Sequence, residues 1–259
     1  MGFRMEREII ERILSNDLKK DPTMENKRKF YLKVSLVVYA VWLVLFEYVG
    51  WHAAKRPTHD ITSLIDGQIP LIPEFIWPYM LCYLFPLLPL MVVEDWHRLN
   101  RALLGIILAN LSAFILFLIF PIAFPRPELG QSLSENILSF LYNIDFPPGA
   151  NKLPSLHVTF TWIVYCACRG QTLNRFGDTI VFCVAVLITL SALFVKQHVI
   201  ADVVVGVCWA FAFWSLAGHL YKSLVDPNID PRVGLKQMLK RLAPIVVIFT
   251  GVIFSMIYF

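Results

Sequence analysis

Apolar residues in this chain are gathered into long runs, and polar residues fall mainly between them. A helix needs roughly 20 predominantly apolar residues to cross a bilayer. Six runs meet or approach that length and a shorter seventh follows them: 34–52, 75–93, 102–124, 154–168, 179–196, 199–221 and 242–259. The pattern predicts an all-α polytopic membrane bundle with a six-span core and an extra C-terminal span.

The polar segments predict how the chain is organised. Prolines cluster between the runs, as expected of loops, and no internal repeat is visible. The fourth run is short, but it follows Pro154, which suits the first turn of a helix. We expect an N-terminal segment over 1–30, a six-span domain over 31–222, and a cytoplasmic linker with the seventh span over 223–259.

Residues 1–30 are charged and amphipathic, and no cleavable signal peptide is expected there. Ile9, Ile10, Ile13 and Leu14 recur at roughly helical spacing. This favours a helix on the cytoplasmic membrane surface, and a soluble helix docked on the bundle is the alternative.

The composition excludes two classes of protein. Apolar residues make up 57% of the 259, charged residues only 16%, and the mean hydropathy is +0.62. An ordinary soluble surface carries more charge, and a disordered chain carries fewer apolar residues. The net charge of +4 is too small to indicate nucleic acid. All five cysteines lie in apolar runs, where they are expected to be small buried residues rather than disulfides or metal ligands.

The distribution of Lys and Arg predicts the orientation. With the N-terminus in the cytoplasm, only five of the 23 basic residues fall outside, and the cytoplasmic side holds the rest. The five are Lys55, Arg56, Arg126, Lys152 and Lys196. We expect a bacterial or archaeal plasma membrane by default.

His198 and Asp202 stand at the start of the sixth span, on the expected outside face. They are four residues apart, so on a helix they share one side. Asp202 is expected to accept a hydrogen bond from one ring nitrogen of His198, which leaves the other free as a nucleophile or base. A pair that only holds the helix end is the alternative. Lys196 adds a cation two residues before His198.

Two more segments reach the same face. Ser155 and His157 begin the fourth span, where unpaired N–H groups suit an anion. Arg126 follows the third span and carries a planar fork that matches phosphate oxygens. Ionisable groups near membrane depth are costly and usually functional. Together these residues predict a phosphate site, with Ser155, Arg126 and Lys196 as its ligands.

These segments resemble the type 2 phosphatidic acid phosphatase superfamily, whose pattern is KxxxxxxRP, PSGH and SRxxxxxHxxxD. In this chain the three read Ile119 to Pro127, Pro154 to His157, and Ser191 to Asp202. The histidines, the Asp and the Arg-Pro pair are in register. The resemblance covers about residues 60–222.

The chain departs from the pattern at two cations, with Ile119 in place of Lys and Ala192 in place of Arg, and it has Leu156 in place of Gly. The PSLH form and the segment 69–79 are similar to the branch that includes inositol phosphorylceramide synthases. We expect Lys196 to replace one lost cation and Lys55 or Arg56 the other. Lys152 and Arg126 flank the loop 125–153, which is expected to act as a lid or to contact the lipid headgroup. Lys152, Lys55 and Arg56 are the expected headgroup contacts.

The resemblance implies a lipid phosphate phosphatase that acts through a phosphohistidine. His198 is then the nucleophile, oriented by Asp202, and His157 donates the proton to the leaving group. No metal or other cofactor is implied. The implied partner is a lipid phosphate from the bilayer, and no nucleic acid is expected.

Three alternatives remain open. The first is a lipid phosphotransferase that passes the phosphoryl headgroup to a hydroxyl. The second is a non-catalytic transporter or scaffold with this fold. The third is a metal site at His157, His198 and Asp202, against which the nearby cations argue.

Overall fold

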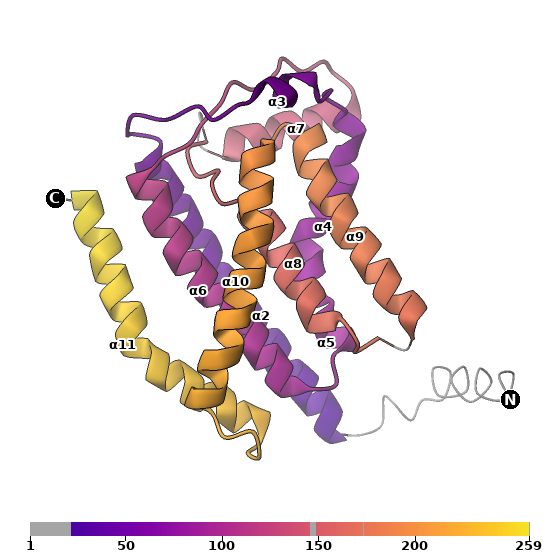
Figure 1. Cartoon of the computed structure of the whole chain (residues 1–259), viewed down its shortest axis with the longest axis vertical. Helices are drawn as coiled ribbons and strands as arrows, with labels where there is room; N and C mark the ends of the chain where they lie inside the picture. The colour runs from indigo at the N-terminus through magenta and orange to yellow at the C-terminus, as the bar shows by residue number, and fades with distance from the viewer. Residues whose placement is uncertain (1–21, 146–148, 173, 259) are drawn as a thin grey trace, which may run out of the picture. The chain divides into compact units, whose positions relative to one another are not determined.

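A computed structural model describes residues 22–145, 149–172 and 174–258, in which helices and loops form the whole fold (Figure 1). The predicted all-α class is confirmed. The N-terminal residues 1–21, with the predicted amphipathic apolar positions, lie outside the described part. Residues 22–30 do not form a separate amphipathic helix, because α2 (Pro22–Ala53) runs through them without a break.

The chain divides into two units. The first is Met1–Val41, of which the first part of α2 is described. The second is Trp42–Phe259 and holds all the other elements. The last helix, α11 (Pro231–Tyr258), belongs to this second unit.

Five described helices are long and apolar enough to cross a membrane, and the chain is a multi-pass membrane protein. The first crosses with Glu25–Ala53 of α2. The others are α6 (Trp96–Ile119), α9 (Arg175–Phe194), α10 (Ile200–Leu224) and α11 (Pro231–Tyr258). A shorter apolar helix, α8 (Leu156–Cys168), occupies the fourth predicted span.

The second predicted span is not one helix. It is divided into α4 (Ile76–Leu84), the 3-10 turn η3 (Phe85–Leu87) and α5 (Pro89–Val92). Pro86 and Pro89 each lack a backbone N–H, so the regular hydrogen bonding cannot continue through them.

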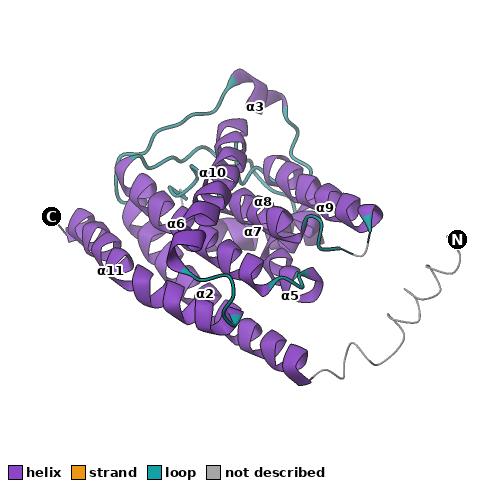
Figure 2. Cartoon of the chain, turned by 60° about the horizontal axis from the view of Figure 1, so that its bottom comes forward, coloured by secondary structure: helices purple, strands orange, loops and turns teal. Residues whose placement is uncertain are grey.

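One end of the second unit gathers the polar segments named above. The ends of α6 and α9 meet the starts of α4, α8 and α10 there (Figure 1). Two further helices, α3 (Leu64–Gln68) and α7 (Leu133–Ile144), lie across this end, and Figure 2 shows α3 in the long loop that covers it. We call this the site end.

The centre of the second unit is formed by α8, which packs between α6, α9 and α10. Gly206 lets α10 approach the start of α8, since a Cβ there would lie 2.8 Å from the Ser155 carbonyl oxygen. Two hydrogen bonds hold the helices together here. The Thr159 hydroxyl donates to the backbone carbonyl oxygen of Gly206 (3.0 Å), and the Ser155 N–H donates to the backbone carbonyl oxygen of Asp202 (3.2 Å). The close packing brings the two histidine-bearing helix starts together.

Candidate functional site

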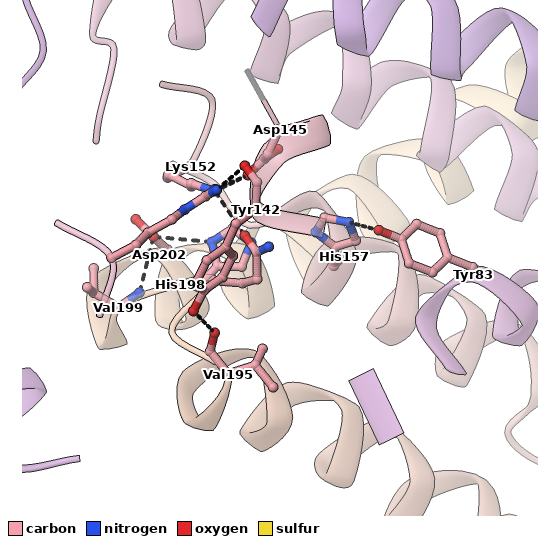
Figure 3. Close-up of polar contacts among 11 residues, drawn as sticks. Tyr83, Tyr142, Asp145, Lys152, His157, Val195, His198, Val199 and Asp202 are labelled. Carbon is pink, nitrogen blue, oxygen red and sulfur yellow. Dashed lines mark hydrogen bonds and ion pairs between the residues drawn. The ribbon is translucent and has the colours of Figure 1, made fainter. Parts of the chain in front are cut away.

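His198 and Asp202 form the predicted pair at the start of α10 (Figure 3). The distance between His198 Nδ1 and Asp202 Oδ2 is 3.2 Å. The same carboxylate oxygen accepts the Val199 N–H at 3.3 Å and so caps the helix. A carboxylate can only accept, so Nδ1 carries the imidazole proton and Nε2 keeps its lone pair.

Both residues of the pair are enclosed by protein. Asp202 is fully buried and His198 is 4% exposed. Burial lowers the pKa of His198 below its ordinary value, and the hydrogen bond that His198 donates to Asp202 opposes that shift in part. The neutral imidazole, which is the nucleophilic form, therefore predominates at neutral pH. The second oxygen of Asp202, Oδ1, is buried without a hydrogen-bond partner among the described residues.

His198 lines a cavity of about 390 Å³ that also contains Lys196 and Arg126. The cavity wall includes the α3 segment and the loop after α6, with Asp60, Thr62, Phe124 and Pro125 among its residues. We call it the polar cavity. The lining carries two cations and a neutral imidazole, together with the carboxylates of Asp60 and Asp66. The cations suit a phosphate group, since guanidinium and ammonium groups bind its oxygens directly.

Lys196 is held beside α3. Its ammonium donates to the carbonyl oxygens of Asp66 (2.9 Å) and Ile69 (2.5 Å). Its backbone has a positive φ of 51°, in the sharp turn between α9 and α10. The turn directs this lysine and His198 to the same cavity, as the sequence predicted.

Arg126 belongs to a buried cluster of ions that the sequence did not reveal. Its guanidinium and the Lys152 ammonium both bind Oδ2 of Asp145, at the end of α7. Figure 3 shows Lys152 beside Asp145. Lys152 also donates to Gln197 Oε1 at 3.1 Å. Burial by itself raises the pKa of Asp145, but the Lys152 and Arg126 cations outweigh it and hold this pKa below its ordinary value. The carboxyl is therefore ionised, and the cluster of three keeps one net positive charge beside the polar cavity.

Tyr142 fixes the position of Arg126. The guanidinium lies over the Tyr142 ring, 4.4 Å from its centroid, and donates to the Tyr142 carbonyl oxygen. The Tyr142 hydroxyl in turn donates to the Val195 oxygen at 2.6 Å. Nε of Arg126 is buried without a partner among the described residues. Tyr142 thus holds the guanidinium where it lines the polar cavity.

His157 lies beside His198 but borders a different space. The ring centroids of the two histidines are 5.8 Å apart, and His157 Nε2 is 3.5 Å from the Tyr83 hydroxyl. His157 lines a second cavity, of about 340 Å³, whose lining residues all differ from those of the polar cavity. The two histidines therefore stand between two cavities, whereas the sequence indicated a single site.

Ser155, predicted to bind phosphate, is instead a structural residue. Its hydroxyl accepts the Val158 N–H at 3.4 Å and caps α8, and the side chain is fully buried. Its own backbone N–H donates to the backbone carbonyl oxygen of Asp202. Its polar groups are used to join α8 to α10, and it lines neither cavity.

Lys55 and Arg56 do not replace the missing cations, contrary to the prediction. Arg56 donates to the carbonyl oxygens of Leu118 and Met256, where it closes the ends of α6 and α11. The Lys55 ammonium sits over the Trp51 ring, 2.9 Å from its centroid. The second cation near His198 is Lys152, which the sequence indicated only as a headgroup contact.

Asp145, Tyr142 and Gln197 are the site residues that sequence reasoning missed. Asp145 lies between Arg126 and Lys152 in the chain, but Glu128 and Glu135 do too, so the sequence did not single it out. Nothing in the spacing marks Tyr142 or Gln197, since their partners are distant in the chain.

No group of three or more His, Cys, Asp or Glu side chains in the described ranges is placed to hold a metal ion. The two histidines and Asp202 contact one another through a single hydrogen bond, between His198 and Asp202. A three-ligand metal site at His157, His198 and Asp202 does not match this geometry.

Comparison with known proteins adds one distant relative. The chain is 22% identical over 199 residues to an uncharacterised protein of Methanocaldococcus jannaschii. The aligned region covers 70% of this chain and 82% of that protein. No protein-family model matches the chain, and no solved structure matches it.

Proposed function

We propose that the chain is a membrane-embedded lipid phosphate phosphatase that works through a phosphohistidine on His198. The observation that carries the proposal is the position of His198. Asp202 holds its Nδ1, and the ring lines a cavity together with Lys196 and Arg126. An oriented imidazole among cations is the arrangement that attack on a phosphate group requires.

In the proposed first step, Nε2 of His198 forms a bond to phosphorus as the bond between phosphorus and the lipid oxygen breaks. The departing oxygen leaves on the side of the second cavity, where His157 gives it a proton. Arg126 and Lys196, with the net charge of the ion cluster, stabilise the negative charge on the phosphoryl oxygens. In the second step, water forms the new bond to phosphorus, the bond to nitrogen breaks, and a water proton returns to His157.

The proposed orientation places the N-terminus in the cytoplasm and the site end on the opposite side. Lys and Arg are concentrated in the segments at the other end of the helices, as the positive-inside tendency favours. A lipid phosphate in the leaflet at the site end would then reach the polar cavity laterally, with its chains still in the bilayer.

A lipid phosphotransferase is the second candidate, and one observation favours it. The second cavity is lined mostly by apolar side chains and borders His157, so it has the character of a place for a second lipid. Transfer would replace water by a lipid hydroxyl in the second step, with His157 taking the hydroxyl proton.

The test is phosphate release from phosphatidate in detergent micelles by purified protein, with a chelator present. His198→Ala is the test variant, and His219→Ala, an exposed histidine on the same helix, is the matched control. We expect release by wild type and His219→Ala and none by His198→Ala. If labelled phosphate moves instead to an added lipid alcohol, the transferase is supported. If His198→Ala matches wild type in both assays, the proposal is wrong.

A further inference from the structure

The second cavity contains a carboxyl group that the proposed chemistry does not use. Glu47 stands in the membrane-crossing part of α2 and lines the cavity with His157, Tyr83 and Tyr79. Asp145 and Gln197 border the same space. The rest of the lining is apolar, contributed by α2, α4 and α7: Trp42, Leu43, Phe46, Met80, Ile137, Phe140, Leu141 and Ile144. We call this the apolar cavity.

The apolar cavity opens on the apolar outer surface of the helices. Leu43, Phe140 and Ile144 contribute to its wall and are also 42%, 66% and 45% exposed. Leu43 stands in the membrane-crossing part of α2, where exposed apolar surface meets lipid tails. A molecule with a long apolar chain can therefore enter it sideways from the bilayer.

Glu47 needs a polar partner that the described residues do not supply. It is half-buried, and no hydrogen bond or ion pair joins it to the described part of the chain. A carboxyl group in a membrane span is costly when no hydrogen bond satisfies it, and such groups usually have a function. Asp145 differs from it, because two cations already hold that carboxylate.

The chemistry of the wall selects the polar group of the occupant. An ionised Glu47 would repel a phosphate or carboxylate, and Arg126 and Lys196 line the polar cavity rather than this one. A hydroxyl both donates and accepts, so it can bind Glu47 whether or not that group is ionised. His157 stands on the same wall, so a hydroxyl there would also lie beside the imidazole.

We propose that the apolar cavity binds a long-chain alcohol, with Glu47 as the group that binds its hydroxyl. The inference rests on the proposed function only for the role that the bound alcohol has in the reaction. There the alcohol is the lipid product that leaves after phosphoryl transfer to His198, or the acceptor that receives the phosphoryl group. Glu47 is then a binding and specificity residue, and His157 handles the proton.

The test is photolabelling of the purified full-length protein with a long-chain primary alcohol that carries a diazirine near the end of its chain. Labelled peptides are identified by mass spectrometry, and a matched hydrocarbon with the same diazirine but no hydroxyl is run in parallel. We expect the alcohol to label the segments around Leu43, Met80 and Phe140 at least fivefold more than the hydrocarbon, in line with one buried hydrogen bond. Excess unlabelled alcohol should suppress this labelling.

The variants give the test its specificity. Glu47→Leu should lower labelling about tenfold, and Glu47→Gln, which still donates and accepts, should stay within about twofold of wild type. Glu74→Leu is the control, because Glu74 is an exposed carboxylate outside both cavities. Leu43→Trp should also lower labelling by filling the cavity entrance, which covers the case in which Glu47→Leu fails to fold.

Two results would overturn the inference. One is equal labelling by alcohol and hydrocarbon, and the other is labelling that neither Glu47→Leu nor Leu43→Trp reduces. His198→Ala should label like wild type. Loss of phosphate chemistry with intact labelling would therefore count against the proposed function and leave the alcohol site standing.

Discussion

Replacing Asp202 by Asn tests how the pair at the start of α10 works. The Asp202 oxygen Oδ2 accepts two hydrogen bonds, from His198 Nδ1 at 3.2 Å and from the Val199 N–H at 3.3 Å. An Asn side chain can keep both bonds only if its oxygen takes the Oδ2 position. Its NH₂ group then takes the place of Oδ1, a buried atom without a partner. The opposite orientation turns NH₂ toward His198 and moves the imidazole proton to Nε2.

The size of the effect follows from these contacts. A buried NH₂ group without an acceptor costs about 1–3 kcal/mol of folding free energy. A hydrogen bond to a charged group is worth roughly 1 kcal/mol more than a neutral one, and a tautomer change removes the Nε2 lone pair altogether. We expect Asp202→Asn to slow phosphorylation of His198 by at least about tenfold, since 1.36 kcal/mol in a barrier is tenfold in rate.

The pH dependence makes the prediction more specific. Burial lowers the pKa of His198, and the bond to Asp202 opposes that shift. Wild type should therefore keep its activity below pH 6.5, the ordinary His value, and lose it as the pH falls through the lowered pKa. In Asp202→Asn the opposing contribution is gone, so the acid limb should move to still lower pH.

The stability of the folded state should also fall as the pH becomes more acidic. The unfolded chain binds a proton on this histidine at a higher pH than the folded chain does, so the folded state loses stability as the pH falls from about 6.5 toward the lowered pKa.

The assay is single-turnover formation of the phosphoenzyme between pH 4 and 8, with a thermal melt of each variant. His219→Ala again serves as the control. If Asp202→Asn forms phosphoenzyme at the wild-type rate with its acid limb unmoved, the carboxylate does not orient the nucleophile. A melting temperature equal to that of wild type would refute the argument from the buried NH₂ group.

Three further variants test other contacts. Ser155→Ala should cost about 1 kcal/mol of stability through the lost α8 cap and change phosphate affinity by less than twofold, as thermal melts and vanadate titration would show; a large loss of affinity would restore it as a phosphate ligand. Lys152→Met should destabilise by about 3 kcal/mol, since Asp145 then keeps only Arg126, and should weaken vanadate binding; unchanged binding would remove Lys152 from the site's electrostatics. Gly206→Ala places a Cβ 2.8 Å from the Ser155 carbonyl oxygen, so we expect about 1–3 kcal/mol of destabilisation and reduced activity. An unchanged melting temperature and activity would show that α8 and α10 do not need to pack this closely.

The fold class and the His198–Asp202 pair follow from the sequence itself. Long apolar runs require helices in a bilayer, because the backbone has no other way to satisfy its polar groups there. The pair is a local feature: His198 lies just before the N-cap Val199 and Asp202 lies in the first turn of α10, so its hydrogen bond joins residues only four apart in the chain. The Lys196 position is local in the same sense, since it shares the turn with His198.

The remaining details depended on contacts between distant segments. The division of α4 and α5 could be anticipated at Pro86 and Pro89, but their apolar neighbours concealed it. The burial of Arg126 against Asp145 and the use of Arg56 at the ends of α6 and α11 join residues that are 19 to 200 positions apart. No periodicity records such pairs.

The separation of the two histidines between two cavities was decided by packing alone. Gly206 draws α10 against the start of α8, and α2, α4 and α7 enclose the space on the far side of His157. The sequence determined which chemical groups reach the site end, because span lengths and turns set that. Only the tertiary structure decided which groups share a cavity, because that depends on how side chains from helices distant in the chain fill the space between them.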